Sequence, residues 1–266
     1  MKIGIIGLGN IGSAFYHGCR KAGHHSLRCF DRNPSKLKTL TGINPEPKQL
    51  ALLCESSDLI VIAVKNNDLA HLLQQMLPFV KEATPLLLTT VGIDRDWLDM
   101  HVPLSMSHPV VRIIPNINIM SAHSHTGIAY LNKVSDEARQ HIEMLMTSLG
   151  TIEHIDDTVC DAFASLYASI PAYLGIFLSA MVDASEHIGF LRETPSYQTI
   201  SNIMIQTLEM MNETHQHPAV IKDLVCSPSG ITIEGINEME YHKIRSVIIK
   251  SFTNSYMKSK DIKTQQ

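Results

Sequence analysis

Residues 2–12 of the chain read KIGIIGLGNIG, a short apolar run that leads into the spacing G-x-G-x-x-G. The run predicts a buried strand over residues 2–6, and apolar residues at helical spacing after it predict a helix. In this context the three glycines allow a tight turn, close approach of the backbone to a pyrophosphate, and close packing of helix on strand. The helix N-terminus offers unpaired N–H groups to phosphate. The alternative is a glycine-rich turn without a ligand. The residues expected to contact a dinucleotide are Gly7, Gly9, Asn10, Ile11 and Gly12.

Short apolar runs continue to alternate with longer amphipathic segments up to residue 156. The helix after the first strand is expected to end at Gly23, and another is bounded by Ser135 as N-cap and Gly150 as stop signal. Strands that alternate with helices indicate a largely parallel, doubly wound α/β sheet with helices on both faces. The predicted strands are residues 2–6, 27–31, 58–64, 85–90, 110–114, 127–131 and 151–155.

From residue 157 onward the β-rich runs disappear, and the sequence predicts an all-helical domain over residues 157–266. Thr194 and Pro195 resemble a helix start, and apolar residues follow at helical spacing. A helical segment of this size that follows a compact sheet domain is not expected to close a core alone, so helices of a second subunit are expected to complete it. The polar tail from residue 258 is expected to fray.

Composition argues against several classes of function. A net charge of −4 and a pI of about 6.4 provide no basic face for nucleic acid. The five cysteines are widely spaced, which fits a reducing cytoplasm better than a disulfide framework or a cysteine zinc site. Histidine pairs lack the helical spacing and neighbouring carboxylate of a metal site, so no metal is expected. The apolar run at residues 173–182 is too short to span a membrane, so no membrane partner is expected.

The end of the second predicted strand bears on the choice of cofactor. Asp31 lies about 20 residues beyond the last glycine of the turn, where an acid binds the ribose 2′-hydroxyl, and this favours NAD. Arg32, Ser35 and Lys36 pull toward NADP because cations and hydroxyls can hold a 2′-phosphate; the alternative is a solvated helix start. The sequence leaves NAD and NADP both open. The residues expected near the adenosine ribose are Asp31, Arg32 and Asn33.

Two further segments carry polar groups at positions suited to a ligand. The strand over residues 110–114 ends in Pro115 and Asn116 at the carboxyl edge of the sheet, where Asn116 can bond a ligand or simply form a turn. Within residues 217–235, small residues from Ser227 to Gly230 precede a predicted helix. Free N–H groups at that helix start suit a substrate carboxylate, and Thr232 adds a hydroxyl.

Together these motifs resemble the pyrroline-5-carboxylate reductase family in order and spacing over nearly the whole chain. The resemblance implies a Rossmann domain over residues 1–156, followed by an all-helical dimerisation and substrate domain. It implies an oxidoreductase of proline biosynthesis that reduces a cyclic imino acid, pyrroline-5-carboxylate, to proline with NAD(P)H. The active site would be shared by two subunits of a homodimer or higher homo-oligomer. The segments that carry the resemblance are residues 5–12, 58–65, 111–116, 171–173, 206–207 and 217–235.

The resemblance also implies roles for individual residues. Thr232 would be the polar group closest to the chemistry, and a protonated imine needs mainly to be oriented near the hydride donor. Ala63 and Lys65 would lie beside the cofactor, and Pro115 and Asn116 near its nicotinamide end. The residues that would hold the substrate carboxylate and ring nitrogen are Ser227, Gly230, Ile231 and Thr232.

The chain departs from the family around the expected imine pocket. The usual Ser-Gly-Ser-Gly is Tyr167-Ala168-Ser169-Ile170, the usual Pro-Gly-Gly-x-Thr has Ser229 as its second residue, the Thr-Pro after Pro-Asn is Ile117-Asn118, and Asn66 replaces a proline. These changes leave a second hypothesis open: a paralogue that binds the nucleotide but acts on a different imine or has a regulatory role. A β-hydroxyacid dehydrogenase ranks last, because no suitably placed lysine is found in the second domain.

Overall fold

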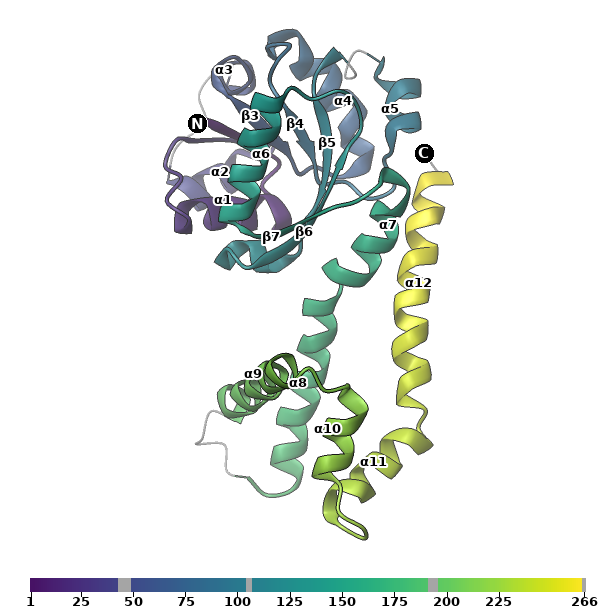
Figure 1. The fold of residues 1–266 in the computed structure, drawn as a ribbon. Helices are drawn as coiled ribbons and strands as arrows, with labels where there is room; N and C mark the ends of the chain where they lie inside the picture. Colours follow the sequence, from purple (N-terminus) through teal and green to yellow (C-terminus); the bar gives the residue numbers. More distant parts are fainter. Residues whose placement is uncertain (43–48, 104–106, 191–195, 265–266) are drawn as a thin grey trace. The chain divides into compact units, whose positions relative to one another are not determined.

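The computed structural model describes residues 1–42, 49–103, 107–190 and 196–264 (Figure 1). The chain forms two compact units, Met1–Ser169 with Ser255–Gln266, and Ile170–Asn254. We call the first the sheet unit and the second the helical unit. The helix start expected at Thr194 and Pro195 lies outside the described residues.

The sheet unit is built on seven strands in the order β2-β1-β3-β4-β5-β6-β7. The first five run parallel, β6 is antiparallel to β5, and β7 is parallel to β6. The carboxyl ends of the parallel strands meet at one edge of the sheet, where open α/β sheets bind ligands. The predicted doubly wound, mostly parallel fold is confirmed. The strands are β1 (Ile3–Ile6), β2 (Leu27–Phe30), β3 (Leu59–Ile62), β4 (Leu86–Leu88), β5 (Val110–Ile114), β6 (Ser124–Tyr130) and β7 (Gly150–His154).

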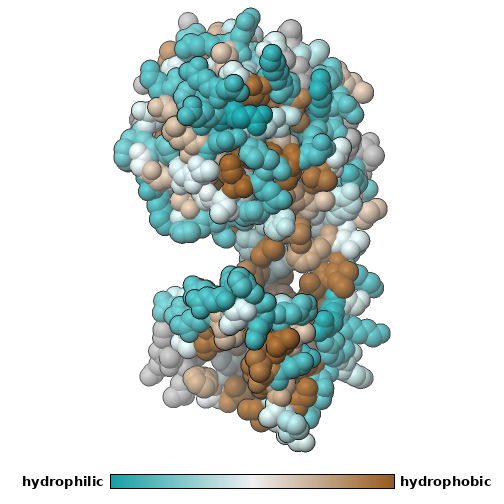
Figure 2. Space-filling view, viewed as in Figure 1, coloured by the Kyte–Doolittle hydropathy of each residue, from teal (hydrophilic) through white to brown (hydrophobic). Residues whose placement is uncertain are grey.

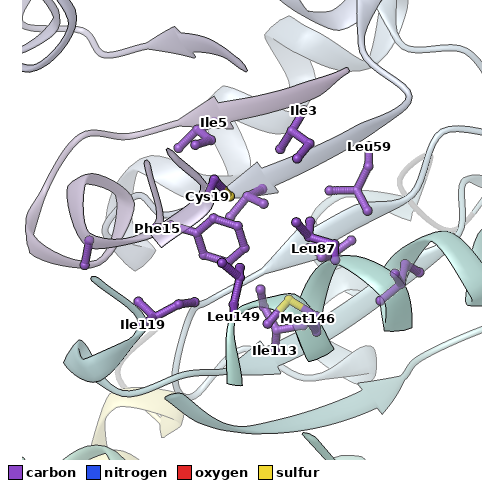
Figure 3. Packing of buried hydrophobic residues seen from close by; sticks show 14 of the residues in the cluster. Ile3, Ile5, Phe15, Cys19, Leu59, Leu87, Ile113, Ile119, Met146 and Leu149 are labelled. Carbon is purple, nitrogen blue, oxygen red and sulfur yellow. The ribbon is translucent and has the colours of Figure 1, made fainter. Parts of the chain in front are cut away.

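Helices cover both faces of this sheet (Figure 1). On one face, Phe15 of α1 packs among Ile5, Ile113 and Leu149 (Figure 3). On the other face, helices α3, α4 and α5 contribute a second buried cluster that includes Leu69. Residues buried on both faces of a parallel sheet explain its nearly continuous apolar strands. The helices are α1 (Asn10–Lys21), α2 (Pro34–Thr41), α3 (Gln49–Ser56), α4 (Asn66–Met76), α5 (Arg95–His101) and α6 (Asp136–Ser148), with the 3-10 turns η1 (Leu77–Phe79) and η3 (Ile117–Ser121).

Residues 157–169 are helical but belong to the sheet unit, because a buried ion-pair network holds them there. The Arg112 side chain in β5 is 1% exposed. Its guanidinium donates to Asp157 at 2.6 Å and to Asp161 at 2.9 Å. Phe163 packs over the same end of the sheet. The segment comprises η4 (Asp157–Val159), α7 (Cys160–Phe163) and the π-helical turn η5 (Ala164–Ala168).

The boundaries between secondary-structure types and between compact units differ. Strands give way to helices at residue 157, while the compact units divide after Ser169, so the limits 1–156 and 157–266 describe secondary structure rather than compact units. The expected fraying of the polar tail is wrong. Helix α12 (Ile244–Thr264) continues through it, Ser259 is 4% exposed, and Ile262 lies against Gly92 of the sheet unit.

The helical unit has almost no core of its own. Among its described residues only Ile221 is buried, while large apolar side chains such as Ile176 and Leu224 are 68% and 71% exposed. Soluble proteins rarely leave so much clustered apolar surface uncovered. The helices are α8 (Ile170–His187), α9 (Ser196–Thr214), α10 (Pro218–Val225), α11 (Ile231–Tyr241) and the first part of α12.

One helical stretch, Asp157–His187, is long and apolar enough by composition to cross a membrane. Its first turns, however, carry Asp157 and Asp161, which pair with Arg112 of the sheet. A single helix of this kind does not establish a span, since a helix covered by another protein chain has the same composition.

Candidate functional site

The glycine turn between β1 and α1 brings backbone segments unusually close together. Gly7 has φ +90°, and a Cβ there would lie 2.5 Å from the carbonyl oxygen of Ala63. A Cβ on Gly12 would collide with the carbonyl oxygen of Gly7. Only glycine is compatible with both positions. The turn therefore packs tightly against β3 and against its own helix.

Gly9 differs from its neighbours because a Cβ at this position would meet no atom within 4 Å. Packing within the protein thus does not require a glycine here. Gly9 is also the N-cap of α1, and no side chain caps the helix, so its first N–H groups are open to a ligand. These are the properties expected of a turn that receives a phosphate.

A cleft of about 540 Å³ opens beside this turn. Gly9 lines it, whereas Asn10, Ile11 and Gly12, which form the first turn of α1, do not. The predicted cofactor residues that line the cleft are Gly7, Gly9, Asp31, Arg32, Ala63 and Lys65.

The opposite wall of the cleft comes from α4 and was not singled out from the sequence. Asp68, His71, Leu72 and Gln75 line it. Their positions repeat at three- and four-residue intervals, so they occupy one face of the helix. That spacing, on a helix that follows a strand of the binding edge, is the signal that would have identified them.

Asp31, directly after β2, uses its carboxylate to bind backbone N–H groups of the two turns around it. Its carboxylate accepts the N–H of Leu8 at 2.7 Å and the N–H of Asn33 at 2.8 Å. The ammonium of Lys36 lies 3.5 Å away, and the Asp31 side chain is 10% exposed. Asp31 therefore positions the glycine turn as well as facing the cleft.

Arg32 reaches across the cleft to the α4 wall. Its guanidinium donates to the carboxylate of Asp68 at 2.9 Å, with the two side chains 84% and 40% exposed. An exposed pair of this kind contributes at most about 1 kcal/mol. A ligand that binds the Arg32 guanidinium more strongly can displace the Asp68 carboxylate.

Besides Asn10, Ile11 and Gly12, three more predicted cofactor residues do not line the cleft: Asn33, Pro115 and Asn116. The Asn33 side chain caps α2 by accepting the N–H of Ser35. Asn116 caps η3, and its own N–H donates to Ser124 Oγ at 3.2 Å. Pro115 and Asn116 follow β5 at the carboxyl edge, the edge that also carries the glycine turn. Their predicted contact with the nicotinamide end stays a prediction.

In the helical unit, the predicted substrate residues form the start of α11. Gly230 is the N-cap, its N–H donates to the carbonyl of Ser227, and a Cβ on it would collide with Ser227 Oγ. Among the described residues, neither the Ser227 nor the Thr232 hydroxyl has a hydrogen-bond partner. Ile231 is 93% exposed. Two free hydroxyls beside an uncapped helix start suit an anionic ligand.

Other chemistries find little support in the described residues. No group of three or more His, Cys, Asp or Glu lies close enough to hold a metal ion there. Burial raises the pKa of each buried cysteine thiol to about 12, which keeps it protonated and unreactive. These cysteines are Cys19, Cys29, Cys54 and Cys160.

Matches to known protein families divide the chain near residue 157, where strands give way to helices. Residues 157–262 match the family model for pyrroline-5-carboxylate reductase dimerisation, and residues 2–88 match that for NADP oxidoreductase, coenzyme F420-dependent. The pyrroline-5-carboxylate reductase of Aquifex aeolicus is 29% identical and the match covers 98% of this chain and 97% of that protein. That of Escherichia coli is 26% identical, with 98% of each covered. These matches support membership of the pyrroline-5-carboxylate reductase family.

The fold of the family extends over the whole chain. A crystal structure of Plasmodium falciparum pyrroline carboxylate reductase, with NADP bound, superposes with a TM-score of 0.88 at 24% identity and covers 99% of this chain and 98% of that one. The Rossmann-type sheet followed by a helical dimerisation region is thereby confirmed.

One departure from the family sequence is structurally neutral. Asn66, in place of the usual proline, is the first residue of α4, where the N–H has no helical partner and proline is equally suited. Its side-chain amide instead donates to the carbonyl of Val91 at 2.6 Å. The substitution ties α4 to the loop after β4.

A second departure introduces backbone strain. Ser229, in place of the second residue of the family's Pro-Gly-Gly turn, has φ +58°. A side chain in this left-handed region costs on the order of 1 kcal/mol. The turn before α11 therefore keeps a glycine conformation without the glycine.

The third departure adds bulk to the sheet unit. Tyr167 lies in the π-helical turn, with its ring 4.6 Å from that of Phe163 and 5.1 Å from that of His125. Like Val91, in the loop after β4, it packs against the buried cluster that contains Phe163. An aromatic cluster thus occupies the position where the family usually has a serine.

Proposed function

We propose that this protein is an NAD(P)H-dependent reductase that converts pyrroline-5-carboxylate to proline. The observation that carries the proposal is the open position over Gly9, at the mouth of the cleft beside the glycine turn. Matches to pyrroline-5-carboxylate reductases over nearly the full chain support it. The nicotinamide cofactor, when bound, supplies the hydride.

The sheet unit would hold the cofactor. The glycine turn and the first N–H groups of α1, from Asn10 to Gly12, would bind the diphosphate. Ala63 and Lys65 line the cleft next to that turn and would run along the cofactor. At the end of β2, the adenosine ribose would meet Asp31 and Arg32.

The start of α11 would hold the substrate. A carboxylate is stabilised by the N–H groups and partial positive charge of a helix N-terminus, here at Gly230 and Ile231. The free hydroxyls of Ser227 and Thr232 would complete its hydrogen bonds. Since a protonated imine is already electrophilic, orientation would account for most of the catalysis, and Thr232 would hold the ring nitrogen.

A second copy of the chain would complete the helical unit. Figure 2 shows apolar side chains on the surface of this unit. Val225 on α10 and Ile203 on α9 are 62% and 58% exposed. A homodimer or higher homo-oligomer would bury this apolar surface, so no membrane would be needed to cover it. Nucleic acid is not among the partners we propose, and buried free cysteines fit a cytoplasmic location.

The direct test is oxidation of NADH or NADPH by the purified protein, followed by absorbance, with pyrroline-5-carboxylate as substrate. We expect turnover that Thr232→Ala reduces at least about 100-fold, the loss typical when an orienting hydrogen bond is removed. Thr207→Ala is the matched control, because the Thr207 hydroxyl bonds only its own helix. Absence of turnover in the wild type, with either cofactor, would contradict the proposal.

A second function is favoured by Tyr167 and Ile170, whose side chains are larger than those usual in the family. In this alternative the protein binds the nucleotide but acts on another imine or has a regulatory role. Cofactor binding detected by calorimetry, without turnover of pyrroline-5-carboxylate, would favour it. A panel of imines of different ring size then separates altered specificity from loss of catalysis.

A further inference from the structure

The end of the cleft nearest β2 has two charged walls. Arg32 and Lys36 come from the turn after β2 and the start of α2, and Asp68 comes from α4. NADP differs from NAD only by a 2′-phosphate on the adenosine ribose. The balance of free cations and free carboxylates at this end therefore decides between them.

Asp31 does not settle that choice by itself. Both of its carboxylate oxygens already accept backbone N–H groups, from Leu8 and Asn33. Its remaining ionic partner is Lys36, at 3.5 Å. The charge of Asp31 is therefore largely compensated within its own wall of the cleft.

Arg32 is compensated from the opposite wall. Its guanidinium bonds Asp68 at 2.9 Å, although 36 residues separate the two in the sequence. A guanidinium offers paired donors that fit phosphate as well as carboxylate, so the two anions compete for it. Breaking this exposed pair is inexpensive but not free.

We propose that Asp68 is a specificity-determining residue that limits the preference for NADP by competing with the 2′-phosphate for Arg32. This inference rests on the proposed function, because it requires a dinucleotide in the cleft. Each cation at this end faces one carboxylate, Lys36 facing Asp31 and Arg32 facing Asp68. A ribose hydroxyl leaves both pairs intact, whereas a 2′-phosphate must take Arg32 from Asp68.

The test compares calorimetric dissociation constants of NADP⁺ and NAD⁺ in the absence of substrate. We expect Asp68→Asn to tighten NADP⁺ on the order of five-fold, and NAD⁺ by less than about two-fold, from the known strength of exposed ion pairs. In an Arg32→Gln background the same substitution should no longer change the ratio. Asp99→Asn is the matched control, because Asp99 pairs with Arg95 at 3.6 Å on α5 and does not line the cleft.

The possible outcomes separate this inference from the proposed function. An unchanged ratio of dissociation constants in Asp68→Asn, or equal tightening of both dinucleotides, overturns the role of Asp68 while cofactor binding stands. An effect that persists without Arg32 overturns the competition. A wild-type protein that binds neither dinucleotide contradicts the proposed function, and this inference with it.

Discussion

The sheet unit and the helical unit bury their apolar residues in opposite ways. In the sheet unit, clusters around Phe15 and Leu69 are enclosed by helices on both faces of the sheet. In the helical unit, Ile221 alone is buried among the described residues, and the side chains of Ile203 and Ile176 are more than half exposed. The first unit carries its own core, while the second provides half of one.

The difference in burial between the two units indicates which unit would carry each part of the proposed function. The cleft lies wholly within the sheet unit, so cofactor binding depends on a core that one chain completes. The free hydroxyls of Ser227 and Thr232 lie in the helical unit, whose exposed apolar surface we propose a second copy covers. Substrate binding should therefore respond to association of the chains, and cofactor binding should not.

The largest expected effect on assembly follows from placing a charge on the uncovered helical surface. Ile203→Glu should weaken self-association at least about tenfold, because the carboxylate would be buried unpaired in the interface. Analytical ultracentrifugation measures the mass, with Met144→Glu, on an exposed position of the sheet unit, as control. Equal masses for the two variants would contradict the assigned interface.

Loss of the buried cation in β5 should destabilise the sheet unit. Arg112→Leu leaves Asp157 and Asp161 without their partner, which costs about 3–5 kcal/mol. The midpoint of urea unfolding, followed by circular dichroism, measures the change. Arg139→Leu, which removes a 43% exposed side chain that lies over the Tyr130 ring and pairs with Glu143, should shift stability by no more than about 1 kcal/mol. Similar shifts in both variants would show that the network does not hold the helical segment to the sheet.

A methyl group on Gly9 separates folding from cofactor binding. Because a Cβ there meets no protein atom, Gly9→Ala should change stability by only about 1 kcal/mol or less. It should weaken NADP⁺ at least about tenfold, since the methyl occupies the approach of the diphosphate. Calorimetry and thermal unfolding on the same sample measure the two effects. Unchanged affinity would place the diphosphate elsewhere.

The smallest effect concerns the strained turn before α11. Ser229→Gly should stabilise the protein by about 0.5–1 kcal/mol, because glycine adopts the left-handed conformation without a penalty. Ser201→Gly, within α9, should instead destabilise it by a similar amount. Denaturant midpoints test both, and a loss of stability in Ser229→Gly would contradict the strain.

Several features were accessible to sequence reasoning because they are local. The glycine spacing at residues 7–12 predicts the turn, since Gly7 and Gly12 allow close approach of neighbouring backbone and Gly9 leaves space for a ligand. His217 is also a local feature, because its ring caps α10 (Pro218–Val225) by accepting the N–H of Ala219, two residues away. Strand positions followed from apolar runs that a parallel sheet requires.

Other features were missed because they join distant parts of the chain. The tail from residue 258 looks polar, yet Ser259 is buried and Ile262 packs on Gly92. The polar residues of α4 were not singled out, because their spacing places them on one helix face but does not show that this face lines a cleft.

The amino-acid order alone determined the succession of strands and helices, the dinucleotide turn and the resemblance to a reductase family, because these depend on residues close in sequence. Tertiary structure decided which charges meet. Arg32 finds Asp68, and Arg112 finds Asp161, only once the sheet has brought together segments 36 and 49 residues apart. Ion pairing depends on distance in space, which no spacing along the chain encodes.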